Sequence, residues 1–197
     1  MKDFFYTIAD QQESLYKEKG SKFIGLCFPV QSEEEVKEVQ EGLRKQYYDA
    51  RHHCYAYILG PKGDRLRAND DGEPNHSAGD PILGQIKSKE LSNTLVVVIR
   101  YFGGTKLGVS GLINAYKTAA QEALDKAKIV KEIIFEHYDL QYSYEITNEV
   151  MKLISDHDLK IIDQSFQADC KATIGVRLAN EKQFKADAGL INGLIIK

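Results

Sequence analysis

The feature that most constrains the fold is a continuous apolar run, Leu95–Ile99, which leads into a glycine-rich segment. Five apolar residues without alternation are typical of a central strand that is buried on both faces of a sheet. Residues 100–102 extend this strand to Gly103-Gly104-Thr105-Lys106-Leu107-Gly108. From Ser110, apolar residues recur with helical period to about Lys126. The pattern therefore predicts a strand, a glycine-rich loop and a long helix in direct succession.

The segments before this run alternate between strand and helix patterns. Strands are predicted over 21–30 and 53–59, with a return strand from Leu66 after the turn at 60–64. A helix is predicted over 33–46, where Ser32 is a candidate N-cap and three glutamates fill the first turn. Residues 69–81 read as a long polar loop, and Pro81 suits the first turn of another helix.

The segment after about residue 136 has a different order of elements. Its pattern predicts strand 138–144, helix 148–155, strands 160–166 and 171–178, helix 181–190 and a short strand 194–196. This βαββαβ order is that of a small ferredoxin-like domain. With a junction near 130–136, we expect an α+β protein with two domains, residues 1–132 and 133–197.

Charge and cysteine content narrow the classes of function. Residues 1–129 hold 18 Lys and Arg against 18 Asp and Glu, and residues 130–197 hold 8 against 11. Nucleic-acid binding would therefore need a local basic patch. The three cysteines form no CxxC pair, so neither a disulfide framework nor a zinc ribbon is expected. No apolar run is long enough for a membrane span and no signal peptide is evident, which predicts a cytoplasmic protein.

The glycine-rich segment is the first candidate site. Glycines let the backbone approach a ligand closely, and the N-terminus of the following helix offers unpaired N–H groups and a positive dipole end. Lys106 would add a mobile charge. The segment matches neither the Walker pattern nor GxGxxG. The alternative is that its glycines only turn the chain tightly.

Two polar segments are further candidates. Asp70, Asp71 and Glu73 stand near His76, where carboxylates could bind a divalent cation or act as acid and base. The alternative is a turn-forming, helix-capping loop or a salt-bridge partner for arginines. In Arg51-His52-His53-Cys54, alternation puts His52 and Cys54 on one face, which is too few ligands for structural zinc. We expect packed side chains there, and no metal or cofactor.

Basic residues lie among aromatic ones in two stretches. Residues 51–67 and residues 87–106 each carry a local charge of +3. Tyr55, Tyr57, Tyr101 and Phe102 lie among these cations, and cations with aromatic rings are what a single-stranded RNA surface uses. The alternative is that the tyrosines are half-buried packing residues.

Four motifs together resemble the IMPACT/YigZ family. They are Ser21-Lys22-Phe23-Ile24-Gly25, Arg51-His52-His53-Cys54-Tyr55-Ala56-Tyr57, Asp70-Asp71-Gly72-Glu73-Pro74 with Ala78-Gly79 and Pro81-Ile82-Leu83, and Val96-Val97-Val98-Ile99-Arg100-Tyr101-Phe102-Gly103-Gly104-Thr105-Lys106-Leu107-Gly108. The resemblance implies a first domain of the ribosomal protein S5 domain 2-like type. It also implies a ferredoxin-like second domain, similar to the last domain of the elongation factor that drives translocation. His76-Ser77 and Ser110 depart from the family pattern, which often has Gly-Thr and Gly there; Ser110 is a reasonable helix N-cap.

The resemblance also suggests a function. Eukaryotic members restrain an initiation-factor-2 kinase by competing for its activator, so a role in regulating translation initiation is implied. We therefore expect a non-enzymatic regulator that binds RNA, the ribosome or a protein partner, without sequence-specific DNA binding. The residues expected to form its site are Arg51, His52, Asp71, Glu73, Arg100, Tyr101, Gly103, Gly104, Thr105, Lys106, Gly108 and Ser110.

Two other functions stay open at this point. A hydrolase or phosphate-binding enzyme would use the acidic loop 70–76 with Lys106, although GxSxG, HExxH and the kinase motifs are absent. A purely structural interaction module would use the glycine loop only as a tight turn.

Overall fold

The computed structural model describes residues 3–166 and 169–197 and divides into two compact units. One unit is Phe5–Glu132. The other joins Asp3 and Phe4 to Ile133–Lys197. Both combine helices with antiparallel sheets, so the predicted α+β class is confirmed.

The first unit is built on a five-stranded antiparallel sheet with the order β2-β3-β6-β4-β5. Its strands are β2 (Gln12–Glu18), β3 (Ser21–Pro29), β4 (His52–Leu59), β5 (Arg65–Asn69) and β6 (Thr94–Tyr101). The apolar run of the sequence lies in β6, which is the middle strand, as predicted. A shorter ribbon pairs β1 (Phe4–Ile8) with β7 (Ile129–Ile133).

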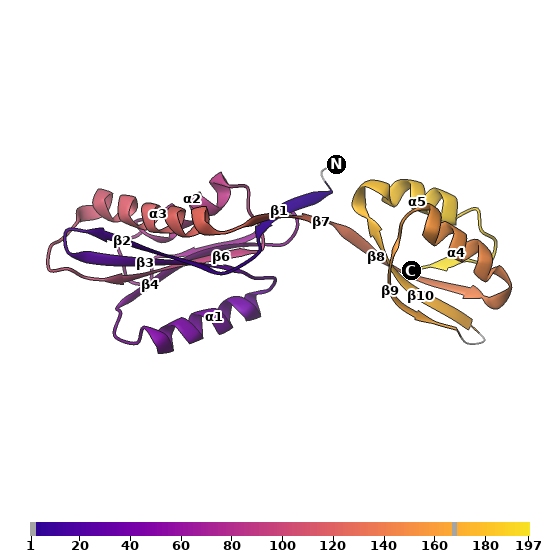
Figure 1. Ribbon diagram of the computed structural model, residues 1–197, viewed down its shortest axis with the longest axis horizontal. Coiled ribbons are helices and arrows are strands. Elements are labelled where there is room, and N and C mark those ends of the chain that lie inside the picture. The colour runs from indigo at the N-terminus through magenta and orange to yellow at the C-terminus, as the bar shows by residue number, and fades with distance from the viewer. Residues whose placement is uncertain (1–2, 167–168) are drawn as a thin grey trace. The chain divides into compact units, whose positions relative to one another are not determined.

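Helices cover both faces of this sheet (Figure 1). Helix α1 (Glu33–Gln46) packs on one face, and α2 (Gly79–Ser88) and α3 (Gly108–Lys126) pack on the other. Val96 and Val98 of β6 face α2 and α3, whereas Leu95, Val97 and Ile99 face α1. Because both faces are buried, the strand carries no polar alternation. No helix in the described ranges is both long and apolar enough to cross a membrane.

The second unit has a four-stranded antiparallel sheet with the order β11-β8-β10-β9. Its strands are β8 (Phe135–Ser143), β9 (Lys160–Ser165), β10 (Asp169–Arg177) and β11 (Ile195–Ile196), and its helices are α4 (Thr147–Asp156) and α5 (Glu181–Ala188). Both helices pack on one face, where Leu140, Ile174 and Phe184 are buried. The predicted βαββαβ order is confirmed, and the other sheet face is open.

Candidate functional site at the glycine loop

The acidic loop begins with a carboxylate that caps a helix. Asp70 Oδ1 accepts hydrogen bonds from the amides of Ala78 at 3.0 Å and Gly79 at 2.8 Å, and Oδ2 accepts one from His76 at 2.9 Å. Burial raises the pKa of Asp70, but the hydrogen bonds from the three N–H donors together lower it by more. The pKa of Asp70 is therefore below its usual value. Helix α2 consequently begins at Gly79, two residues earlier than predicted.

We expect the Asp70→Asn substitution to flatten the acid dependence of stability. A carboxyl with a lowered folded-state pKa contributes stability that is complete above its unfolded pKa of about 3.9 and is lost as pH falls through the folded value. Wild-type protein should therefore lose stability below about pH 4 more steeply than the variant. Urea denaturation at pH 7 and at a series of acidic values would measure this, and parallel curves would contradict it.

The other two carboxylates of the acidic loop are also engaged by the chain itself. Asp71 accepts from the backbone of His53 at 2.6 Å and from Arg44 at 2.9 Å, and its carbonyl lies 2.9 Å from His52 Nδ1. Glu73 Oε1, which is buried, accepts from Arg100 Nη1 at 2.6 Å and from Tyr116 Oη at 2.7 Å. The geometry therefore supports the second interpretation of residues 70–76, in which the carboxylates cap a helix and form salt bridges with arginines.

Cys54 and Tyr116 lie beside the acidic loop and are buried. Burial raises the pKa of the Cys54 thiol and of the Tyr116 hydroxyl, so both stay protonated near neutral pH. Cys54 Sγ donates to the carbonyl of Asp70 at 3.0 Å and faces the core. Among residues 3–166 and 169–197, no three His, Cys, Asp or Glu side chains are grouped in a way that could hold a metal ion.

Glu73 links the two elements on either side of the glycine loop. Arg100 lies in β6, immediately before the loop, and Tyr116 lies in α3, immediately after it. A single buried carboxylate therefore holds the end of β6 and the middle of α3 together. The acidic loop thus acts as a support for the glycine loop.

Gly103 brings the glycine loop against the β2–β3 turn. A Cβ atom on Gly103 would lie 1.9 Å from the carbonyl carbon of Gly20 and 2.1 Å from the nitrogen of Ser21. The amide of Gly103 donates to Ser21 Oγ at 3.1 Å. Only glycine fits at such a close backbone contact. The contact places the exposed Lys19 and Lys22 beside the loop.

The amides that follow Gly103 are available to a ligand. Within the described chain, the amides of Gly104, Thr105 and Lys106 make no backbone hydrogen bond. Gly108, Val109 and Ser110 open α3, so their amides have no intrahelical acceptor. All six residues are exposed. Ser110 is not the cap that was predicted, because Gly108, with φ of +74°, turns the chain and the helix begins there.

A groove of about 390 Å³ lies beside the loop, at the end of the sheet where β4 begins and β6 ends. The residues that line it are Asp49, Arg51, His52, Arg100, Tyr101 and Phe102. His52 and Arg100 are directly opposite each other on β4 and β6. Tyr101 donates to Asp49 at 2.7 Å, and this hydrogen bond to a carboxylate raises the pKa of Tyr101 to about 12.

Arg100 forms one wall of this groove. Its guanidinium carbon lies 5.5 Å from the ring centre of Phe23 and 5.6 Å from that of Phe102, within the range of cation–π attraction. Arg100 is only 7% exposed. Its Nε atom is buried and has no hydrogen-bond partner in the described residues. The guanidinium therefore keeps one unused donor.

We define the glycine-loop face as the groove residues together with residues 103–110, Lys19 and Lys22. Of the predicted site residues, Arg51, His52, Arg100 and Tyr101 meet in the groove. Gly103, Gly104, Thr105, Lys106, Gly108 and Ser110 continue from it. Asp71 and Glu73 support it from behind. Lys19 and Lys22 were missed, although Lys19-Gly20 between two β-prone segments is a hairpin-turn signal.

The broader basic and aromatic surface predicted from residues 51–67 and 87–106 does not form. Tyr55 and Tyr57 are buried under α1 and stack on each other at 6.4 Å. Lys62, Arg65 and Arg67 lie on the β4–β5 turn and the edge strand β5. Lys89 pairs with Asp125 at the far end of α2. These residues are close in sequence but not in space. Successive side chains of a strand point to opposite faces of the sheet, and the two ends of a strand lie at opposite ends of the sheet.

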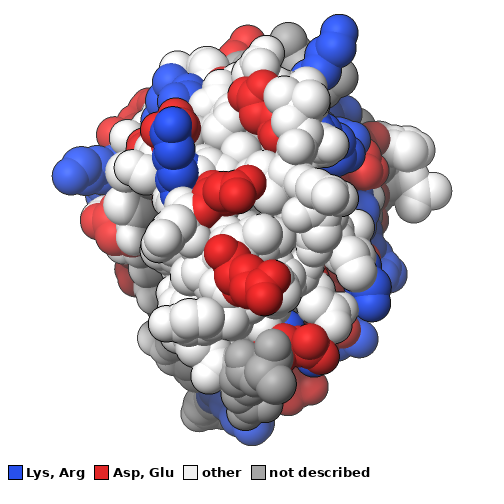
Figure 2. Space-filling model, turned by 90° about the vertical axis from the view of Figure 1, so that its right-hand side faces the viewer, with Lys and Arg blue, Asp and Glu red and all other residues white. Residues whose placement is uncertain are grey.

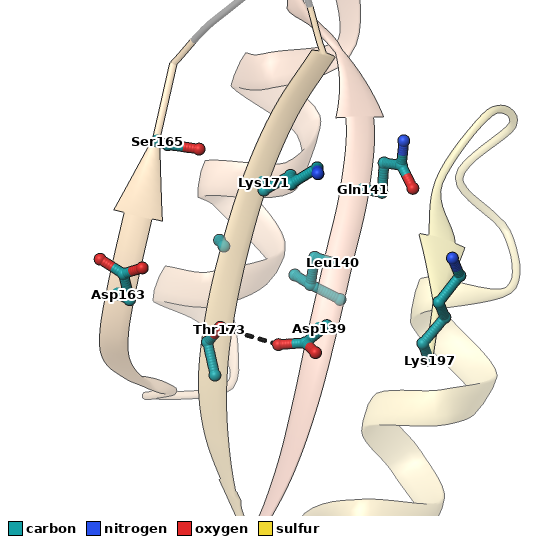
Figure 3. A pocket seen from close by; sticks show the side chains of 9 residues that line it. Asp139, Leu140, Gln141, Asp163, Ser165, Lys171, Thr173 and Lys197 are labelled. Carbon is teal, nitrogen blue, oxygen red and sulfur yellow. Dashed lines mark hydrogen bonds between the residues drawn. The ribbon is translucent and has the colours of Figure 1, made fainter.

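The open sheet face of the second unit carries a second hollow, of about 310 Å³ (Figure 3). Asp139 and Gln141 of β8, Lys171 and Thr173 of β10, and Asp163 and Ser165 of β9 line it, with Lys197 beside Asp139. Thr173 donates to Asp139 at 2.7 Å. The charges cancel, and Tyr138 and Tyr142 belong to the helix-side core, so no ring for base stacking lines this hollow.

Figure 2 shows the second unit from the right-hand end of the view in Figure 1. Separate acidic side chains lie near its middle, and the Lys and Arg drawn there form no continuous area among the described residues. A surface for an anionic ligand is therefore better developed in the first unit.

Fold and site together define a two-unit α+β protein with a ligand-accessible loop between a central strand and a helix. A family model described as the Impact N-terminal domain matches residues 19–124. The IMPACT family member YigZ of Escherichia coli (strain K12) is 33% identical over 170 residues, which are 85% of this chain and 83% of the relative. The IMPACT family member YvyE of Bacillus subtilis (strain 168) is 36% identical over 150 residues, 74% and 69% of the two chains.

A solved structure agrees with these sequence matches. A crystal structure of a hypothetical protein aligns with 100% of this chain and 97% of its own, with a TM-score of 0.76 and 30% identity. The chain belongs to the IMPACT family.

Proposed function

We propose that this protein is a non-enzymatic regulator linked to translation, and that the glycine-loop face binds its partner. The observation that carries the proposal is the row of exposed amides at 104–106 and 108–110, next to the groove. Exposed N–H groups at the start of a helix attract anionic or hydrogen-bonding ligands. Membership of the IMPACT family supports the link to translation, because the family resemblance implies a role in initiation.

The engagement of the acidic loop supports a binding role over an enzymatic one. An enzyme built on residues 70–76 and Lys106 would need its carboxylates to face a substrate. Asp70, Asp71 and Glu73 instead bind amides, arginines and a tyrosine of the same chain. His76 is exposed and pairs with Asp80 at 2.6 Å.

The test is a cell-free translation extract depleted of this protein and supplied with a reporter message. Adding the full chain should change the reporter yield, and part of the protein should sediment with ribosomal particles. The double variant Arg51→Ala, Lys106→Ala should lose at least half of both effects, because it removes two exposed cations of the face. Lys62→Ala, at the opposite end of the sheet, is the matched control and should behave like wild type.

Thermal unfolding of each variant would confirm that it is folded. The proposal would be overturned if wild-type protein left the yield unchanged and did not sediment with ribosomal particles. It would also be overturned if the double variant and Lys62→Ala behaved alike.

A further inference from the structure

We infer that the glycine-loop face binds single-stranded RNA, with phosphates on the loop and a base on Phe102. This inference rests on the proposed function, since it names the ligand of the same face. The loop alone would fit any small anion. Three further features of the face favour a single nucleic-acid strand over a small anion. They are an exposed aromatic ring, an unused buried donor and a group of unpaired cations.

Phe102 offers a ring on which a base can stack. It is 58% exposed, and the guanidinium of Arg100 lies over one face of the ring. Glu73 and the ring of Phe23 hold Arg100 in place. The guanidinium that lies over the Phe102 ring is therefore fixed in position. More than half of the Phe102 side chain remains exposed to water. Stacking on such a ring tolerates every base, because every base has a π-face.

Arg100 has a buried hydrogen-bond donor, its Nε–H group, for which the described residues provide no acceptor. Its Nε is buried and without a partner in the described residues, and the side chain lines the groove. A buried donor left without an acceptor is costly, and native proteins rarely leave one. A base carbonyl that reached Nε from the groove would satisfy it. This observation is independent of the helix start.

Four exposed cations surround the loop and the groove. Lys19, Lys22, Arg51 and Lys106 form no ion pair in the part of the chain that the structure describes, and Asp49 is bound by Tyr101. Lys22 and Tyr101 are opposite each other on β3 and β6, so the cations of the turn lie beside the groove. Phosphates that follow one another along a strand would meet the cations and the amides in succession.

The test is fluorescence anisotropy of the full chain with a 5′-labelled oligouridine of 12 nucleotides, between 50 and 200 mM salt. We expect Phe102→Leu to weaken binding about tenfold through lost stacking. It should leave the salt dependence unchanged. Lys106→Ala should lower the slope of log K against log salt by about 0.7, the value for one phosphate contact on a single strand.

Two residues that are not part of the glycine-loop face serve as matched controls. Phe166→Leu changes a phenylalanine of similar exposure, 56%, in the second unit, and Lys62→Ala removes an exposed lysine at the other end of the sheet. Both should bind like wild type. Absence of binding at 50 mM salt would overturn the inference, as would an equal loss in Phe102→Leu and Phe166→Leu. Equal or tighter binding of the matching DNA strand would also overturn it.

Failure of this inference can be separated from failure of the proposed function. If oligouridine does not bind while sedimentation with ribosomal particles still depends on Arg51 and Lys106, the ligand is not single-stranded RNA, and the proposed function stands. The exposed Val109 and Ile113 beside the loop would then be the contacts to change next.

Discussion

Replacing Glu73 with alanine should lower the free energy of unfolding of the first unit by about 3–5 kcal/mol. The carboxylate and Arg100 are both more than nine-tenths buried, and their charged atoms lie 2.6 Å apart. Removing the carboxylate leaves a buried guanidinium without its counter-charge and takes the acceptor from Tyr116. The loss of stability should appear in urea denaturation followed by circular dichroism.

A paired replacement separates loss of charge balance from loss of packing. Glu73→Leu with Arg100→Met removes both charges and should recover most of the stability, since apolar pairs often replace buried ion pairs at little cost. Asp71→Ala breaks a partly exposed ion pair with Arg44 and a hydrogen bond from the His53 amide, and it should still cost less than Glu73→Ala because it leaves no buried charge unpaired. A loss below about 1 kcal/mol for Glu73→Ala would show that water reaches Arg100.

Gly103→Ala should destabilise the first unit by about 3 kcal/mol or more. The new methyl carbon would lie 1.9 Å from the carbonyl carbon of Gly20, and the atoms it meets are backbone, so no side chain can rotate away. The β2–β3 turn would have to move from the loop. Thermal unfolding would measure the loss.

Gly104→Ala is the matched control for that substitution. No atom lies within 4 Å of the position of its Cβ, so only the left-handed backbone, with φ of +88°, opposes it. That strain costs about 1–2 kcal/mol. Equal losses in the two variants would contradict the close contact between Gly103 and Gly20.

Much of the fold follows from local patterns in the sequence. The uninterrupted run Leu95–Ile99 requires a strand covered on both sides, and α1 and α3 cover it. The helix from Ser32 follows from its cap, whose side chain accepts from Glu35 at 3.2 Å. The order of elements after residue 136 is equally local. Such signals are strong because periodicity and caps depend only on neighbours in sequence.

The site depends on contacts that no local pattern encodes. Lys19 and Lys22 reach the loop because Gly20 touches Gly103, more than eighty residues later. The ribbon of β1 and β7 was missed because each of its strands has only five residues, and the edge strand β2 was missed because its sequence is largely polar. Tyr55 and Tyr57 were grouped with nearby cations, although α1 covers their face of the sheet.

Asp3 belongs to the second unit although the whole of the first unit follows it in the sequence. Its carbonyl accepts from Ile134 at 2.8 Å, and its carboxylate pairs with Arg177, which follows 174 residues later. At about 5–20 residues per second, translation separates the two partners by roughly 10–35 s. The first unit can fold within that interval, whereas the second unit is complete only after its last strands have been made and have bound the segment that carries Asp3. During synthesis, completion of the second unit therefore depends on a segment that was made before the whole of the first unit.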